Sequence, residues 1–176
     1  MIYYKTASTT EELNQILALQ QENLPEALSE EEQKHEGFVT VRHNFDLLNR
    51  MNDVCAHIVA TYKGKVIGYS LCMHPKFEEE IEVLQPMFTE IKKVVPDGKQ
   101  FVVMGQICID KGYRKQGVFR NLYETMLLEI QPKFDSIITE VDLINNRSLQ
   151  AHYAVGFKLL SRYQSGGQDW ALISLS

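Results

Sequence analysis

The stretch that most constrains this chain is residues 106–120, where an apolar run leads through a basic turn into an amphipathic segment. Gly112 and Gly117 let the backbone bend there and let a ligand come close. The first N–H groups of a helix have no partner inside it, and the helix dipole makes that end electropositive. The stretch therefore predicts a strand, an anion-binding turn and a helix, with added positive charge from Arg114, Lys115 and Arg120. We interpret the anion as the pyrophosphate of a coenzyme.

Length and charge exclude several classes of protein. A chain of 176 residues is expected to form a single domain over residues 1–176. Its net charge of −5 argues against a nucleic-acid partner, because general nucleic-acid binders are normally basic. No apolar run approaches the ~20 residues of a membrane span, so no membrane partner is expected. The N-terminus begins with a strand pattern rather than a signal peptide, which favours a cytoplasmic location.

The cysteines and histidines give no sign of a metal site. Cys55, Cys72 and Cys108 are odd in number and far apart, and each lies in an apolar, strand-like run. They match neither a disulfide framework nor a metal motif, so we expect buried, reduced thiols. The histidines also lack metal-ligand spacing, and no metal is predicted.

The first half of the chain shows helical and strand patterns in alternation. A strand at residues 2–5 precedes a capping box at residues 8–12 that opens a helix. A second helix is expected near residues 45–51. Strands at residues 57–62 and 66–73 flank a glycine-bearing turn and predict a hairpin. Two segments stay open: residues 25–36 as a short helix or surface connection, and residues 38–41 as a strand or loop.

The second half of the chain predicts a parallel crossover. Residues 77–95 have a helical period that Pro86 interrupts, giving two short helices or one kinked helix. A buried strand at residues 101–109, a helix at 118–130 and a strand at 136–143 then form the crossover. A helix ending at Gly156 and two final strands complete the order β-α-α-β-β-(α)-β-α-β-α-β-β. The fold class is mixed α/β, with a central sheet of six to seven strands and helices on both faces.

This order, together with two motifs, resembles the GNAT superfamily of N-acetyltransferases over nearly the whole chain. The family pattern at the turn is Arg or Gln, two residues, Gly, one residue, then Gly or Ala. Arg114 and Gly117 match it, and Phe119 departs at the last position. The resemblance implies a GNAT-like domain with a V-shaped splay between the two central parallel strands. Acetyl-CoA would lie in that gap.

The resemblance also implies which residues hold the coenzyme. The pantetheine arm would pair with the exposed backbone of the first central strand, as an added strand would. The backbone N–H groups of the turn would hold the pyrophosphate. The implied cofactor-binding residues are Ile107, Cys108, Ile109, Arg114, Lys115, Gln116, Gly117, Val118, Phe119 and Asn145.

The second motif places a proton donor near the departing thiolate. The family has an Asn, a helix bearing a Tyr, and then Gly-Phe. Asn145 takes the Asn position, but His152 stands four residues before Gly156, where the Tyr is usual. Tyr153 follows one place later, about 100° further round the helix. Either His152 protonates the thiolate, or Tyr153 reaches it, or no side chain does.

The reaction also needs a base, because an amine with a pKa of about 10.4 is mostly protonated at neutral pH. The candidates are Glu140, Asp110 and Asp142, although Asp110 also fits a turn residue. Strand alternation puts Glu140 and Asp142 on one face. An acidic residue in the middle of a strand favours Glu140 as the base. The alternative is that Glu140 faces a polar surface or pairs with a lysine.

The sequence thus predicts an enzyme that transfers an acetyl group from acetyl-CoA to a primary amine by direct attack on the thioester. The acceptor would be a small-molecule amine or an exposed amino group of a peptide. A non-catalytic acyl-CoA-binding sensor or regulatory module is the alternative, because the usual Tyr is missing. An acyltransferase for longer acyl groups is a third interpretation. The resemblance also allows a homodimer.

Overall fold

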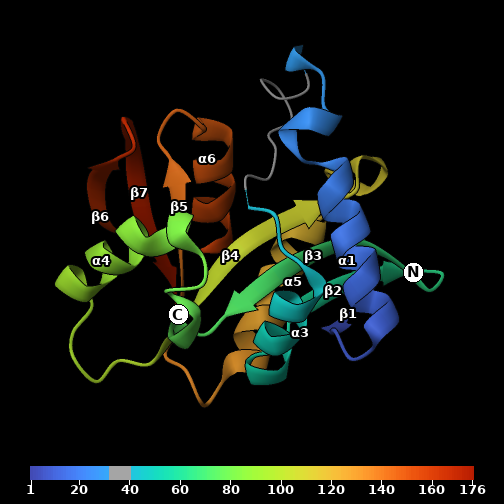
Figure 1. The fold of residues 1–176 in the computed structure, drawn as a ribbon, viewed down its shortest axis with the longest axis horizontal. Coiled ribbons are helices and arrows are strands. Elements are labelled where there is room, and N and C mark those ends of the chain that lie inside the picture. The colour runs from blue at the N-terminus through green and yellow to red at the C-terminus, as the bar shows by residue number, and fades with distance from the viewer. Residues whose placement is uncertain (32–40) are drawn as a thin grey trace. The chain divides into compact units, whose positions relative to one another are not determined.

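A computed structural model of the chain describes residues 1–31 and 41–176 (Figure 1). Seven strands form a mixed sheet in the order β1-β2-β3-β4-β5-β7-β6, which confirms the predicted fold class. The chain divides into two compact units, and strand β4 contributes to both. Unit 1 comprises Met1–Cys72 and Gly105–Glu129, and unit 2 comprises Met73–Met104 and Ile130–Ser176.

Within its described residues, unit 1 contains three long helices and the first strands of the sheet. Its elements are β1 (Tyr3–Thr6), α1 (Thr10–Glu22), η1 (Pro25–Ala27), α3 (Phe45–Val54), β2 (Ile58–Tyr62), β3 (Lys65–Met73), the second half of β4 (Phe101–Ile109), η4 (Lys111–Tyr113) and α5 (Val118–Ile130). The predicted helices and hairpin are confirmed. Residues 32–40 lie outside the described residues. This range includes residues 38–40 of the segment predicted as a strand or loop, and residues 32–36 of the segment predicted as a short helix or surface connection.

Local side-chain contacts start the first two helices of unit 1. Thr9 caps α1, because its Oγ1 accepts a hydrogen bond of 3.1 Å from the Glu12 N–H. The Glu12 carboxylate accepts one of 2.8 Å from the N–H of Ser8, the residue before the cap, so the return bond of the expected capping box is made one residue early. Asn44 caps α3 in the same way, accepting a bond of 2.8 Å from the Leu47 N–H.

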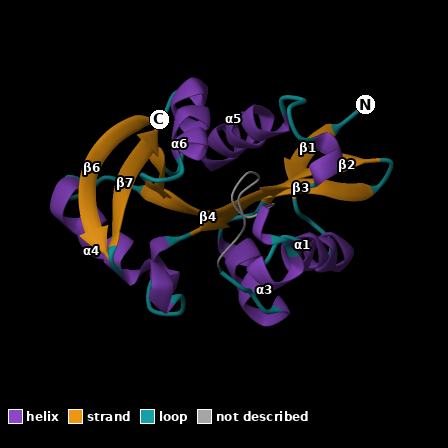
Figure 2. Cartoon of the chain, turned by 90° about the horizontal axis from the view of Figure 1, so that it is seen from above, coloured by secondary structure: helices purple, strands orange, loops and turns teal. Residues whose placement is uncertain are grey.

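Helices cover both faces of the strands of unit 1. Figure 2 shows α5 on one face of β2 and β3, and α1 and α3 on the other. The α1–α3 side is packed by apolar residues of a single core cluster, including Leu13, Ile16, Leu48, Tyr69, Leu71 and Cys108. On the α5 side, Ser70 Oγ lies 3.8 Å from the Met126 sulfur. The second half of β4 therefore has one face toward each layer.

Unit 2 holds the remaining strands of the sheet and two α-helices. Its elements are η2 (Pro75–Phe77), η3 (Glu82–Leu84), α4 (Gln85–Val94), the first half of β4, β5 (Ser136–Asp142), α6 (Asn146–Val155), β6 (Lys158–Ser165) and β7 (Gln168–Leu175). Within this unit, Figure 2 shows α6 and α4 on opposite faces of β5, β7 and β6. Pro86 does not interrupt a helix as expected. It lies in the first turn of α4, where its missing N–H costs nothing.

The parallel ladder between β4 and β5 confirms the predicted crossover. Among the described residues it covers three pairs, from Phe101 with Ser136 to Val103 with Ile138. Next to it, the Thr139 hydroxyl donates a bond of 2.9 Å to the Met104 carbonyl oxygen. The ladder ends at Val103 and Ile138, within strands of nine and seven residues.

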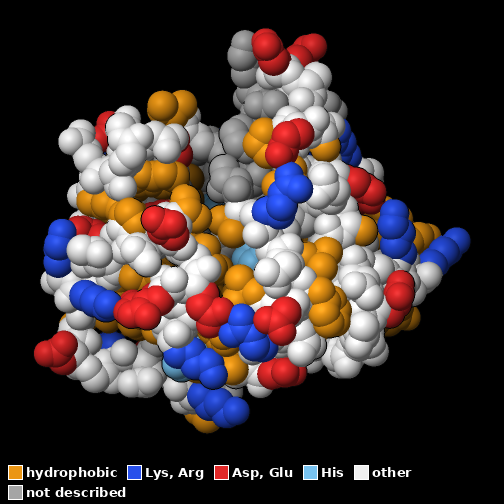
Figure 3. Space-filling model, in the orientation of Figure 1, with side chains coloured by type: hydrophobic (Ala, Val, Ile, Leu, Met, Phe, Trp, Pro, Cys, Tyr) orange, Lys and Arg blue, Asp and Glu red, His pale blue; other side chains and the backbone are white. Residues whose placement is uncertain are grey.

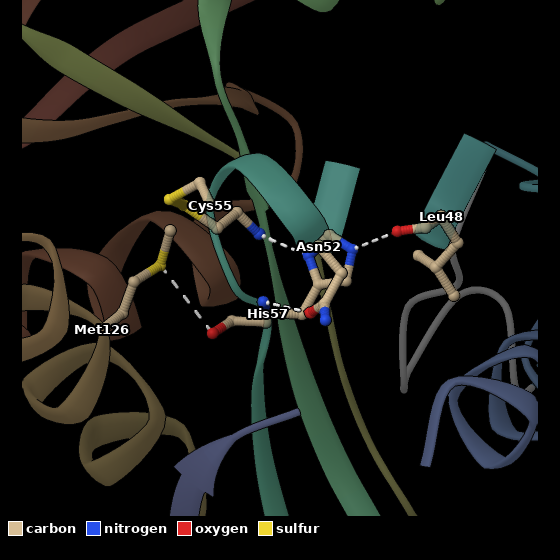
Figure 4. The surroundings of a disulfide bond; sticks show 7 residues. Leu48, Asn52, Cys55, His57 and Met126 are labelled. Atoms are coloured by element: carbon tan, nitrogen blue, oxygen red, sulfur yellow. Dashed lines mark hydrogen bonds between the residues drawn. A yellow bond between two sulfur atoms is a disulfide. The ribbon is translucent and has the colours of Figure 1, made fainter. Parts of the chain in front are cut away.

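The expectation of three reduced thiols is wrong for two of them. Cys55 and Cys72 form a disulfide, whose surroundings Figure 4 shows. Cys55 is the C-cap of α3 and Cys72 lies near the end of β3, and the fold brings their Cα atoms to 5.8 Å. A pairing that depends on tertiary packing leaves no spacing signal in the sequence. Cys108 remains a buried free thiol, as expected.

His57 lies beside this disulfide, just before β2, and joins α3 to β3. Its Nε2 lies 3.1 Å from the Leu48 carbonyl oxygen, and its Nδ1 accepts a bond of 3.0 Å from the Cys72 N–H. The His57 N–H donates to Asn52 Oδ1 at 2.8 Å (Figure 4). Burial lowers the pKa of His57 to about 4, so the neutral ring acts as a structural tie.

On the face shown in Figure 3, acidic and basic side chains are interspersed. Within residues 1–31 and 41–176, no helix combines the length and the hydropathy that crossing a membrane requires.

Candidate functional site

The predicted anion-binding turn of unit 1 has a preformed backbone. After β4, the short helix η4 leads to Arg114, and Lys115 and Gly117 then adopt φ values of 61° and 80°. Gln116 separates the two, and a turn that contains left-handed residues can direct successive backbone N–H groups toward one side, as in anion-binding concavities. The Asn121 N–H donates to the Gly117 carbonyl oxygen at 3.1 Å, which marks the first turn of α5. The turn is thus formed as a strand-to-helix connection, and its contact with a phosphate stays a prediction.

Arg114 supports the turn from within. Its Nε donates a bond of 3.1 Å to the Ile109 carbonyl oxygen, and its Nη2 donates one of 3.1 Å to Asn23 Oδ1. These bonds join the turn to the end of β4 and to the residue that caps the C-terminus of α1. Asn23 is 4% exposed and was not predicted from the sequence, because its role depends on a contact between distant segments. Lys115 and Arg120 remain exposed at the surface of the turn.

The other end of the turn is held by Asp110. Its Oδ1 accepts a bond of 2.9 Å from the Gly112 N–H, and its N–H donates to the Ile67 carbonyl oxygen at 2.9 Å. Asp110 is therefore a turn residue, which was the alternative to its role as a base.

The strand residues predicted to hold the pantetheine arm alternate between the two faces of β4. Cys108 is buried in the core cluster, whereas Ile107 and Ile109 are partly exposed. Burial raises the pKa of the Cys108 thiol to about 12, although the nearby Arg114 charge opposes this. Cys108 is thus neutral at physiological pH, and only its main chain is suited to the predicted contact.

Gln106 lies next to these residues in a fully bonded polar cluster. Its Oε1 accepts bonds of 2.7 Å from Gln20 Nε2 and from the Tyr69 hydroxyl, and its Nε2 donates to the Val41 carbonyl oxygen at 2.8 Å. Gln20 Nε2 also lies 2.9 Å from His43 Nδ1. Burial lowers the pKa of His43 to about 4. The neutral cluster fixes β4, the predicted coenzyme strand, against α1.

In unit 2, Glu140 occupies a site suited to a general base. It lies in the middle of β5 and is partly buried. Burial raises the pKa of Glu140 to about 7, and a hydrogen bond from the Tyr163 hydroxyl to its Oε2 acts in the opposite direction. A carboxyl group with this pKa can both accept and release a proton near neutral pH. The alternative of a lysine partner is not observed among the described residues.

The partner of Glu140 could not be found from the sequence. Residues directly opposite each other in antiparallel strands share a face, and Glu140 pairs with Leu172, which pairs with Ser161. Tyr163 follows Ser161 by two residues and has the same face. A bulge between Leu159 and Ser161 reverses the alternation of β6, so a strict period of two would place Tyr163 on the wrong face.

Asp142, the other carboxylate on this strand face, is already engaged. Its Oδ1 accepts a bond of 2.9 Å from the Ile144 N–H, and its Oδ2 accepts one of 2.7 Å from Gln168 Nε2. These bonds shape the end of β5 and favour a structural role for Asp142.

His152 is held inside unit 2 by α6. It is 3% exposed, and its Nδ1 lies 2.7 Å from the Ser148 carbonyl oxygen, which can only accept a hydrogen bond. Burial lowers the pKa of His152 to about 4, against the raising effect of the Ser148 bond. At neutral pH the single ring proton is therefore on Nδ1, where the backbone binds it. This arrangement disfavours His152 as the donor to a thiolate.

The other predicted residues of α6 lie near its ends. Tyr153 is half-buried and follows His152. Asn145 caps the helix, because its Oδ1 accepts a bond of 3.0 Å from the Ser148 N–H. Gly156 ends the helix as expected, with a φ of 126°. Over the described residues, no group of three or more acidic, histidine or cysteine side chains could hold a metal ion.

Comparison with solved structures decides the fold. The Escherichia coli ribosomal-protein-S18-alanine N-acetyltransferase aligns over 99% of this chain and 93% of its own, with a TM-score of 0.63 and 15% identity. Arabidopsis thaliana Naa50, in complex with the bisubstrate analogue CoA-Ac-MVNAL, aligns over 99% and 98%, with a TM-score of 0.65 and 16% identity. The chain has the GNAT fold. Salmonella typhimurium yncA, solved with its cofactor acetyl-CoA, shares this GNAT fold at a TM-score of 0.66 and 12% identity, over 99% of this chain and 93% of its own.

Sequence comparison alone does not reach the GNAT fold. No protein-family model matches the chain, and no curated protein matches it. The three solved structures share only 12–16% identity with this chain. The likeness establishes the architecture, and the function has to be argued from the residues themselves.

Proposed function

We propose that the chain is an N-acetyltransferase that moves an acetyl group from acetyl-CoA to a primary amine, with residues 1–176 acting as one catalytic domain. The observation that carries the proposal is the turn before α5, where Lys115 and Gly117 hold left-handed backbone conformations within a GNAT fold. A non-glycine residue in this conformation is strained, and such strain is often kept at functional sites.

The turn and β4 are the proposed coenzyme-binding elements. The backbone of residues 114–119 would hold the pyrophosphate, with charge from Lys115, and the backbone of residues 107–109 would hold the pantetheine arm. The fit is supported by the open surface at Gly117, where an added Cβ would meet only Asn121 Nδ2, at 3.6 Å. A phosphate can therefore approach the main chain closely. Asn145 would act through the start of α6, which it caps.

Glu140 is the proposed general base. Acetyl-CoA supplies the activated acetyl group as its thioester. Glu140 takes a proton from the ammonium form of the acceptor, and the amine nitrogen then attacks the thioester carbonyl carbon. The carbon–sulfur bond breaks, the nitrogen of the new amide loses its second proton to solvent, and the CoA thiolate leaves and takes up a proton. Tyr153 is the proposed donor of that proton, because the Nδ1 proton of His152 is bound by the Ser148 carbonyl oxygen.

The acceptor we propose is the exposed amino group of a peptide. Two proteins with this fold support the choice: the Naa50 complex contains a CoA–peptide bisubstrate analogue, and the NatC complex was solved with Gag peptide and CoA. A small-molecule amine is the other expected acceptor. Both the homodimer and the cytoplasmic location stay predictions. The Cys55–Cys72 disulfide weighs against the latter, because such bonds persist mainly in oxidising compartments.

Release of free CoA thiol, measured over a panel of peptides and small amines, tests the proposal. Turnover with at least one amine and its loss in Glu140→Gln are the expected results. Glu79→Gln is the matched control, because it removes an exposed carboxylate from unit 2 without touching β5. Equal turnover in Glu140→Gln and the wild type would rule out Glu140 as the base.

A non-catalytic acyl-CoA sensor is the second candidate. The buried, neutral state of His152 at the position of the family Tyr is the observation that favours it. Tight acetyl-CoA binding by calorimetry, with no CoA release across the whole panel, would identify a sensor. Turnover that falls in Tyr153→Phe supports the enzyme.

A further inference from the structure

Tyr163 makes the only hydrogen bond to Glu140 among the described residues. Its hydroxyl donates to Glu140 Oε2, although Tyr163 is on β6 and Glu140 is on β5, with β7 between these strands. The contact needs the face that Ser161, Leu172 and Glu140 share. It also needs a side chain long enough to cross one strand, which a tyrosine is.

The two carboxylate oxygens of Glu140 differ in their hydrogen bonding. Within residues 1–31 and 41–176, no donor bonds to Oε1. Every fully buried side-chain nitrogen or oxygen of the described residues has a hydrogen-bond partner. Since Oε1 has none, it is not fully buried. One oxygen is thus held from inside the protein while the other can accept a proton.

From this geometry we infer that Tyr163 is a positioning residue for proton removal: it holds Oε2 and presents Oε1 of Glu140 to the acceptor amine. The inference rests on the proposed function for the role of Glu140 as base. It adds a residue that acts through Glu140 and need not touch the substrate.

The charges around the pair define the effect of Tyr163 on the base. Burial favours the neutral form of Glu140, and the Tyr163 bond favours the ionised form. Glu90 of α4 is the other carboxylate that acts on Tyr163, and both carboxylates raise the pKa of the Tyr163 hydroxyl after burial. Glu90 is itself bonded to Ser161 at 2.6 Å and to Lys93 at 3.1 Å. Tyr163 therefore stays protonated and keeps donating to Glu140.

The test is Tyr163→Phe, which keeps the ring and removes the hydroxyl. The carboxyl carbon of Glu140 is titrated by ¹³C NMR, assigned with Glu140→Gln, and kcat/KM is measured against pH. The pKa of Glu140 from NMR and the apparent pKa of the kcat/KM profile are both expected to rise by about one to two units, because a hydrogen bond to a charged group is lost. Activity should fall about tenfold at pH 7 and recover near pH 9. A merely structural role would not produce this recovery.

Ser161→Ala is the matched control. It removes another β6 hydroxyl on the same face, which bonds to Glu90 rather than Glu140, and should leave the Glu140 titration unchanged. Circular dichroism and thermal unfolding verify that both variants fold. An unmoved Glu140 titration in Tyr163→Phe overturns the inference, as does a moved titration with an unmoved rate profile. A wild type without turnover overturns the proposed function instead, and the NMR titration then still decides whether Tyr163 holds Glu140.

Discussion

Gly68 of β3 and Val118, the first residue of α5, approach so closely that a Cβ atom on Gly68 would lie 3.3 Å from Val118 Cγ1. The same atom would lie 3.3 Å from the Cys108 carbonyl oxygen. The missing side chain of Gly68 thus lets the end of β4 and the start of α5 pack against β3. These two ends flank the proposed phosphate turn, so its position depends on a residue of another strand.

Gly68→Ala should displace the start of α5 and weaken coenzyme binding about tenfold. The added methyl group must push backbone and a β-branched side chain, at a cost of about 1–3 kcal/mol in the free energy of unfolding. Calorimetry with CoA and urea unfolding measure the two effects. Gly105→Ala is the control for stability, because a Cβ there meets no atom within 4 Å. If Gly68→Ala is destabilised but binds CoA with unchanged affinity, the packing at Gly68 does not set the position of the proposed phosphate turn.

Lys115→Gly should raise stability while lowering coenzyme affinity. Glycine relieves the strain of the left-handed conformation at φ 61°. After the entropy that glycine loses on folding is subtracted, the free energy of unfolding should rise by about 0.5–1 kcal/mol. The lost charge should weaken CoA binding about tenfold at low salt, and less as salt screens the phosphate. Lys63→Gly is the matched control, since Lys63 has a φ of 50° in the β2–β3 turn. It should gain similar stability in urea unfolding and keep full affinity; a parallel loss of affinity there would contradict the assignment.

Glu140→Gln should stabilise the fold at high pH. Because burial raises the pKa of Glu140 to about 7, the folded state binds its proton more tightly than the unfolded chain does. The contribution of protonated Glu140 to the free energy of unfolding is complete below the pKa that the group has in the unfolded chain. It is lost as pH rises through about 7. The free energy of unfolding of the variant minus that of the wild type should be ~2–3 kcal/mol larger at pH 8 than at pH 4. Urea unfolding at both pH values measures this, and a difference that does not change with pH would mean that Glu140 is not held in an unfavourable site.

Reduction of the Cys55–Cys72 disulfide should destabilise the chain by about 3 kcal/mol, from the entropy of closing a loop of this length. Cys55→Ser should show the same loss under oxidising conditions. With a reductant present, the variant and the wild type should unfold at similar urea concentrations. If the variant still unfolds at a lower urea concentration than the wild type under reducing conditions, the loss of stability comes from packing instead of the cross-link.

The sequence predicted the features that are decided by neighbouring residues. The Thr9 cap, the hairpin turn at Gly64 and the stop at Gly156 each depend on contacts within a few positions, so their residue types identify them. The turn before α5 was found for the same reason. Glu140 was found because a carboxylate in the middle of a strand is unusual. Each of these signals is local.

The tertiary structure alone decided how those pieces work together. Whether Tyr163 meets Glu140 depends on the bulge after Leu159, because one extra residue exchanges the two faces of a strand. The disulfide of Cys55 depends on where α3 ends relative to β3. Sequence thus determined the GNAT-like order of elements and the turn before α5, through short-range sterics and hydrogen bonding. Packing between distant segments decided which side chain bonds to Glu140 and left His152 neutral in the core.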